Sequence, residues 1–142
     1  MLTMNKKEAL QVLAILSASY PKYYLNITDE ETQGIVSVWA LQFANVPADI
    51  VLMALNKAVS SNEKYPPNIA EVKKKIESIH WEAYEMIERN YRLKNLTDDQ
   101  LANYKRIYKE TESYKFGKIE PSIKEMLPKR ENKLIERSEG NG

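Results

Sequence analysis

The sequence predicts an all-α fold: a compact N-terminal domain of about four helices, followed by a charged helical and flexible C-terminal extension. Apolar residues recur at intervals of three and four along much of the chain, which is the helical period. Asn or Thr repeatedly precedes Glu or Gln by three positions, the spacing of a capping box. Only 4 of the 142 residues are glycine, which disfavours short β-hairpins.

The first helix is predicted to begin after Asn5, with Glu8 at the box position. It ends at Tyr20 because Pro21 pushes the preceding residue out of the α region. Its apolar stripe contains Leu10, Leu13, Leu16 and Tyr20. The stretch PKYYLNIT is then expected to be a connector with buried aromatic residues.

The second helix is predicted to begin after Thr28, which forms a T-x-x-E box with Glu31. Pro47 fits the first position of a third helix. The expected inward face of the second helix is Ile35, Val38, Trp39 and Phe43. That of the third helix is Ile50, Val51, Ala54, Leu55, Ala58 and Val59. Residues 60–64 are polar and predict a loop.

The stretch Tyr65-Pro66-Pro67-Asn68 predicts a structural corner. Each proline restricts its own backbone and that of the residue before it, so the chain is extended here. Asn68 is expected to cap the fourth helix, with Glu71 three residues on. The prolines thus fix the entry angle of that helix, and Tyr65 is expected to pack into the corner.

The fourth helix is expected to run from Ile69 to about Lys94, because this stretch contains neither Pro nor Gly. At 1.5 Å per residue it spans about 39 Å. Thr97 then predicts a fifth helix that fades near Ser113, with Leu101, Tyr104 and Tyr108 on one face. We therefore expect a helical domain in residues 1–78, a helical extension in 79–115 and a flexible partner-binding tail in 116–142.

The motifs of common enzyme classes are missing, so we predict no enzyme, no catalytic residue, no cofactor and no metal. Neither a phosphate-binding loop nor a G-x-G-x-x-G or G-x-S-x-G motif occurs. His80 is the sole histidine, and its place in a helical stripe favours a structural role. Glu82, Glu85 and Glu88 favour a solvated face over a metal site, because no Glu-x-x-His motif accompanies them.

Two kinds of macromolecular partner are compatible with the remaining features. Lys73-Lys74-Lys75 and Lys105-Arg106 lie near tyrosines that can stack on bases. However, residues 69–142 carry 16 basic and 14 acidic side chains, which disfavours direct DNA binding. The tail instead carries apolar residues within a charged segment, which is typical of an element that folds onto a protein partner. These candidate anchors are Ile119, Ile123, Met126 and Leu127, and their packing on their own domain is the alternative.

The chain has no cysteine, which suits a reducing cytoplasm. No apolar run is long enough to predict a membrane span, and the N-terminus does not resemble a secretory signal. We therefore expect a cytoplasmic protein.

The stretches EALQVLAILSASYPKYY and YPPNIAEVKKKI, with helices around Trp39 and after Pro47 between them, resemble the phage replicative-helicase loader/inhibitor family. The resemblance covers roughly residues 5–77. Its most specific parts are Tyr65 to Ile69 at the entry to the last helix and Tyr20-Pro21 at the end of the first.

The resemblance implies a phage replication protein that binds the hexameric replicative DNA helicase in the host cytoplasm. Such proteins restrain the ATPase and unwinding of the helicase and help load it at the origin with the phage origin-binding initiator. They have no nucleotide site of their own, and their flexible C-terminal part contacts the helicase. Whether single-stranded-DNA-binding protein is a further partner stays open. The alternative function is a small helical DNA-binding regulator of replication or transcription.

Overall fold

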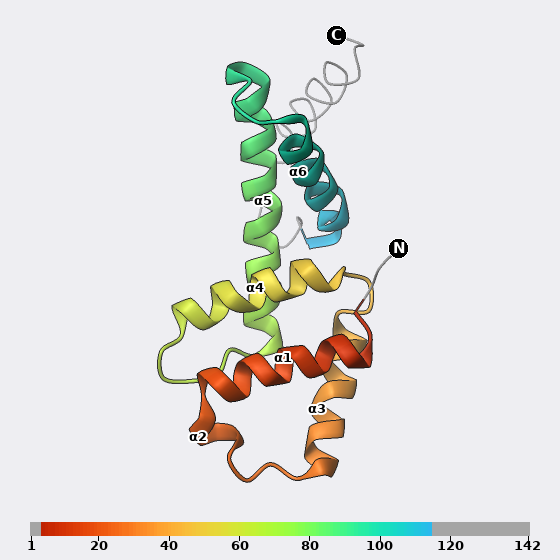
Figure 1. Cartoon of the computed structure of the whole chain (residues 1–142), viewed down its shortest axis with the longest axis vertical. Coiled ribbons are helices and arrows are strands. Elements are labelled where there is room, and N and C mark those ends of the chain that lie inside the picture. The colour runs from red at the N-terminus through yellow and green to blue at the C-terminus, as the bar shows by residue number, and fades with distance from the viewer. Residues whose placement is uncertain (1–3, 115–142) are drawn as a thin grey trace, which may run out of the picture. The chain divides into compact units, whose positions relative to one another are not determined.

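The computed structural model describes residues 4–114, and every regular element in this part of the chain is a helix (Figure 1). The predicted all-α fold is thereby confirmed. The chain divides into two compact units, Met1–Ile76 and Glu77–Gly142. The functional boundaries expected after residues 78 and 115 stay predictions.

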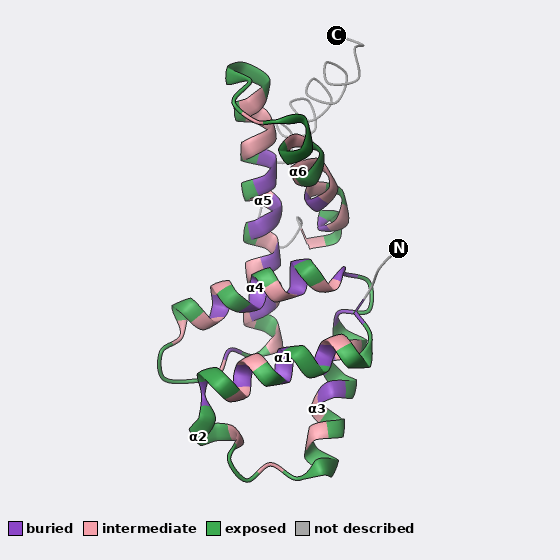
Figure 2. Ribbon diagram, viewed as in Figure 1, coloured by how far each residue is buried: buried purple, intermediate pink, exposed green. Residues whose placement is uncertain are grey.

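The first unit is built around α1, which contacts α2, α3 and α4. The bounds are Lys6–Ser19 for α1, Pro21–Tyr24 for α2, Asp29–Gln42 for α3 and Ala48–Ser61 for α4. The first two turns of α5 (Ile69–Leu93) complete this unit. Along α1 and α4, buried segments alternate with exposed ones, as expected for amphipathic helices (Figure 2). The fully buried residues include Val12, Leu16, Val36, Phe43, Ile50, Val51, Leu55, Val72 and Ile76.

The helix starts follow from local capping chemistry. The Asn5 side chain accepts a 2.9 Å hydrogen bond from the backbone of Glu8, whose carboxylate accepts one of 3.0 Å in return. Thr28 with Glu31 and Thr97 with Gln100 form the same reciprocal pair. Each pair satisfies backbone N–H groups that the helix leaves without a partner. The predicted capping boxes at these positions are confirmed.

The inward face of α3 differs from the expected one at Val36 and Val38. Trp39 and Phe43 are buried as expected, and their rings lie 5.5 Å apart. Val36 is also buried, whereas Val38 is 49% exposed, so the predicted burial of Val38 was wrong. Ile35 is half-buried at the edge of the two stripes. Both stripes have three- and four-residue spacing, and only the packing against α1 selects between them.

The connections between helices are shorter than predicted. Part of the expected connector after Tyr20 is the short helix α2, and its Tyr23 is exposed rather than buried. The helix α4 continues to Ser61 into the expected loop. Pro47 lies one residue before α4, at the N-cap position, rather than inside the first turn.

The second unit contains the rest of α5, α6 (Asp98–Glu110) and the short 3₁₀ helix η1 (Glu112–Tyr114). The end of α5 at Leu93 agrees with the prediction, and Lys94 follows in the left-handed region with φ 50°. Here Asn90 accepts a 2.9 Å hydrogen bond at Oδ1 from the backbone of Leu96, which stabilises the turn. The described core of this unit consists of Ile79, His80, Ala83, Tyr84, Ile107 and Thr111.

The buried residue of α6 was not predicted. Ile107 is buried, whereas the expected Leu101, Tyr104 and Tyr108 are half-buried. The helical period of the three predicted residues is correct, but the centre of the buried face lies beside them. Tyr108 still contributes through its ring, which stacks on the His80 imidazole at a centroid distance of 4.5 Å.

Candidate partner-binding surface

The predicted corner before α5 is held by a reciprocal pair between Asn68 and Glu71. Asn68 Oδ1 accepts a 2.8 Å hydrogen bond from the backbone of Glu71, and Glu71 Oε1 accepts one of 3.1 Å from the backbone of Asn68. The expected capping role of Asn68 is therefore confirmed. Pro67 is buried beside it and Pro66 is half-buried.

The other carboxylate oxygen of Glu71 ties this corner to the end of α4. Asn62 Nδ2 donates a 2.8 Å hydrogen bond to Glu71 Oε2. Asn62 also accepts at its backbone oxygen from the buried Tyr20 hydroxyl at the end of α1. A chain of hydrogen bonds thus joins the ends of α1 and α4 to the start of α5.

This arrangement has an electrostatic signature. The hydrogen bonds from Asn62 and from the Asn68 backbone, aided by Lys74 and Lys75, hold the pKa of the Glu71 carboxyl below its usual range. Burial, with a further contribution from the charge of Glu71, raises the pKa of the Tyr20 hydroxyl. Glu71 is therefore ionised and Tyr20 neutral at physiological pH, so the network is structural in character.

Tyr65 does not pack into the corner as predicted. It is 66% exposed, and its ring meets the exposed Tyr23 edge-on at a centroid distance of 6.3 Å. The sequence expectation of burial was wrong for Tyr65, and the buried residue of the corner is Pro67. The result is a pair of aromatic side chains on the surface of the first unit.

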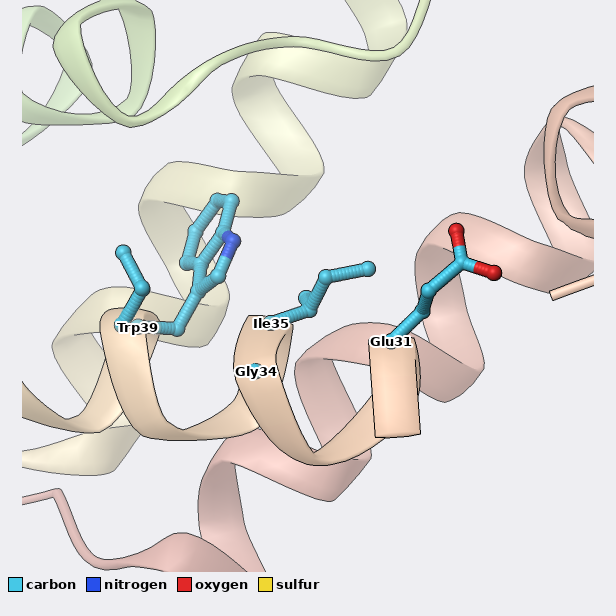
Figure 3. Close-up of a pocket in the computed structure, with 5 residues that line it drawn as sticks. Glu31, Gly34, Ile35 and Trp39 are labelled. Atoms are coloured by element: carbon cyan, nitrogen blue, oxygen red, sulfur yellow. The ribbon is translucent and has the colours of Figure 1, made fainter. Parts of the chain in front are cut away.

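The surface of α3 contains a hollow. It is lined by Glu31, Gly34, Ile35, Val38 and Trp39. Figure 3 shows Glu31, Ile35 and Trp39 rising from the same side of α3, with Gly34 contributing no side chain. Leu41, which is 74% exposed, follows Val38 by one helical turn and extends the apolar face beyond the hollow.

Gly34 is the unusual member of this surface. Glycine inside a helix costs roughly 0.5–1 kcal/mol relative to alanine. A β-carbon built at Gly34 would meet nothing within 4 Å, so no close approach within the described residues requires glycine here. Its backbone also lies in ordinary helical geometry. The internal packing of the first unit therefore gives no reason for this glycine.

The three consecutive lysines Lys73, Lys74 and Lys75 interact with other residues of the first unit. Lys73 Nζ donates a 2.8 Å hydrogen bond to Gln42 Oε1 and lies 5.9 Å from the centre of the Phe43 ring. The positive charges of Lys74 and Lys75 both help to lower the pKa of the Glu71 carboxyl. This run therefore balances charge on the first unit itself, rather than presenting an isolated basic stripe.

His80 lies in the interior of the second unit. The Thr111 hydroxyl donates a 2.7 Å hydrogen bond to the Ile107 carbonyl, so its oxygen is the acceptor for the His80 Nδ1–H at 2.9 Å. Both His80 and Thr111 are fully buried. This position agrees with the structural role predicted for His80.

The remaining predicted features are described only in part. Among residues 4–114, no group of His, Asp or Glu side chains has the arrangement of a metal site. No helix in that range is both long and apolar enough to cross a membrane. The anchors Ile119, Ile123, Met126 and Leu127 lie outside the described residues.

Comparison with known families gives a match over the helices that carry these surfaces. Residues 4–73 match the family model for the N-terminal domain of the phage helicase loader/inhibitor gp39P. The N-terminal part of the chain belongs to this family. The match confirms the resemblance seen in the sequence and identifies a phage helicase-associated protein. Comparison with curated proteins and with solved structures found no match.

The loader/inhibitor N-terminal domain of this chain includes both the corner at Asn68 and the hollow on α3. The corner was predicted from the sequence, but the hollow was not. Gly34 was an available signal, since it is a glycine inside a capped helical pattern. The exposure of Val38 and Leu41 became apparent only with the packing of α3.

Proposed function

We propose that this protein binds the hexameric replicative DNA helicase through its C-terminal tail, restrains its ATPase and unwinding, and helps to load it at the origin. The phage origin-binding initiator is the second partner, and single-stranded-DNA-binding protein is a candidate third. The protein acts in the host cytoplasm as a regulator without an enzymatic activity of its own. The observation that carries this proposal is the match of residues 4–73 to the loader/inhibitor N-terminal domain.

The composition of the tail supports its role as the helicase contact. Ile119, Ile123, Met126 and Leu127 supply apolar anchors within a segment rich in Lys, Arg and Glu. Binding through such a segment buries the anchors and orders the chain around them, which costs about 2–5 kcal/mol of the gross interaction energy. This cost lowers the net affinity of the tail for the helicase. A lower affinity allows the contact to be released when the helicase is delivered.

The direct test measures binding of the full chain to a purified replicative helicase of the phage or its host. The helicase is loaded with a non-hydrolysable ATP analogue, and the complex is followed by gel filtration with light scattering. We expect a complex with the wild-type chain and loss of that complex with Ile123→Glu combined with Leu127→Glu. A matched variant, Ser122→Glu combined with Asn132→Glu, adds the same charge at polar positions and is expected to bind.

A second measurement addresses regulation. Steady-state ATP hydrolysis by the helicase is expected to fall as the wild-type chain is added, and not to fall with the Ile123→Glu, Leu127→Glu variant. Continued suppression of ATP turnover by this variant would show that the tail is not the inhibitory contact. Loading is then measured as helicase recruitment to origin DNA that carries the initiator, with and without this protein.

Direct DNA binding is the alternative, and it predicts a measurable affinity that falls steeply with salt. The hydrogen bond from Lys73 to Gln42 and the electrostatic attraction of Lys74 and Lys75 to Glu71 oppose it. A gel-shift experiment at low salt with single- and double-stranded DNA separates the two functions, since the helicase-binding proposal expects no shift.

A further inference from the structure

The surface of α3 carries an apolar stripe that the first unit does not use in its core. The stripe consists of Gly34, Ile35, Val38 and Leu41, and Glu31 lies at its N-terminal end; we call these five residues the α3 face. Val38 is 49% and Leu41 74% exposed. Large apolar side chains that stay this exposed on adjacent turns are typical of interaction surfaces.

The hollow at Gly34 gives the α3 face a specific shape. It is open because Gly34 has no side chain and nothing in the described structure fills the space (Figure 3). Any larger residue would narrow the hollow, and alanine would strengthen the helix. A glycine that weakens its helix and serves no internal contact is explained by an external group that occupies the space.

The charge of α3 restricts what that group can be. Asp29, Glu30 and Glu31 lie in the first turn, and the sequence of α3 contains no basic residue. Glu31 itself lines the hollow. An occupant that places an apolar side chain beside Gly34 therefore brings its neighbouring residues next to carboxylates, which favours Lys or Arg and opposes Asp or Glu.

We propose that the α3 face is a second docking site for the replicative helicase, which inserts an apolar side chain of a short amphipathic helix into the hollow at Gly34 and presents a basic residue to Glu31. The α3 face extends over about three turns, which is a length that such a helix covers with apolar residues at three- and four-residue spacing. This inference rests on the proposed function and adds a contact on the helical domain to the contact through the tail. Two tethered contacts strengthen each other through their high effective concentration.

Substitutions on the α3 face test the proposal in the full chain. Val38→Glu and Leu41→Glu change exposed residues, so the fold is expected to persist, which circular dichroism checks. Each is expected to weaken binding to the nucleotide-bound helicase about tenfold. Gln33→Glu adds the same charge to an exposed position of α3 away from the hollow and is expected to bind like the wild type.

Site-specific crosslinking gives an independent readout, because the chain has no native cysteine. Val38→Cys and Leu41→Cys variants carrying a photoactivatable crosslinker are expected to couple to the helicase, and Gln33→Cys much less. A crosslink that forms only within this chain or with a second copy would identify a different occupant and overturn the proposal.

The two proposals fail in distinguishable ways. If the wild-type chain forms no complex with the helicase, the proposed function is wrong and the α3 face loses its partner. If the wild-type chain binds and Val38→Glu binds equally well as Gln33→Glu, the second docking site is wrong while the proposed function stands.

Discussion

Asn62, the C-cap residue of α4, donates a 2.8 Å hydrogen bond to the Glu71 carboxylate in the first turn of α5. The same carboxylate caps the backbone of Asn68 at 3.1 Å. One side chain therefore serves both as part of a helix cap and as a tie to the preceding helix. The corner that the two prolines stiffen depends on this single acid.

Glu71→Ala is expected to destabilise the first unit by about 1–2 kcal/mol, because it removes one half of a cap and the acceptor of the Asn62 amide. The free energy of unfolding is measured by urea titration, with Trp39 fluorescence as a local signal in a Trp81→Phe background. Glu63→Ala removes a nearby exposed acid and is expected to change stability by less than about 0.5 kcal/mol. Equal effects of the two variants would contradict the role assigned to Glu71.

The stability contribution of ionised Glu71 is expected to disappear in acid. The pKa of this carboxyl is lower in the folded chain than its ordinary value of 4.5, so the unfolded chain binds a proton first as the pH falls. The contribution is complete above that ordinary value and is lost as the pH falls through the folded pKa. Urea titrations of the wild type and Glu71→Gln at pH 7 and pH 3 measure this, and we expect their difference in stability to shrink at pH 3.

Thr111→Val is expected to destabilise the packing of α6 on α5 in the second unit by about 1–3 kcal/mol. Valine keeps the shape but removes the acceptor of the buried His80 Nδ1–H, and leaving such a donor without its partner is costly. Amide hydrogen exchange of α6 residues provides the measurement, with faster exchange expected in the variant.

Thr32→Val is the matched control for Thr111→Val. The Thr32 hydroxyl also donates to the carbonyl four residues back, at 2.9 Å, but the bond is exposed and has no imidazole partner. Its loss is expected to cost less than about 0.5 kcal/mol. If Thr111→Val is equally mild, the His80 contact does not hold the two helices together.

Gly34→Ala is expected to stabilise the first unit by roughly 0.5–1 kcal/mol, since the added methyl meets nothing within 4 Å and alanine favours the helix. Thermal unfolding followed by circular dichroism tests this, with Ser37→Ala as a second exposed alanine substitution on α3. If the hollow receives a helicase side chain, the more stable Gly34→Ala variant binds the helicase less tightly. A loss of stability would show that Gly34 has an internal role.

The start of each capped helix was predictable from the sequence because a cap is a local contact between residues three positions apart. Each cap residue accepts a hydrogen bond from a backbone N–H in the first turn of its own helix, and this contact does not depend on tertiary packing. The four cap residues are Asn5, Thr28, Asn68 and Thr97. The helix-ending effect of Pro21 and the long uninterrupted α5 are local in the same sense. The all-α fold follows from these elements.

Only the tertiary structure decided which side of each helix is buried and which residues meet across helices. A period of three and four residues fits two neighbouring stripes, so the packing of α3 buried Val36 and left Val38 exposed. The bonds from Asn62 to Glu71 and from His80 to Thr111 join positions whose proximity no local rule specifies. Local patterns in the sequence therefore determined that this chain is helical and that it lacks the motifs of common enzyme classes. The exposed face at Gly34 depends on how α3 packs on its neighbours, so only the tertiary structure decided it.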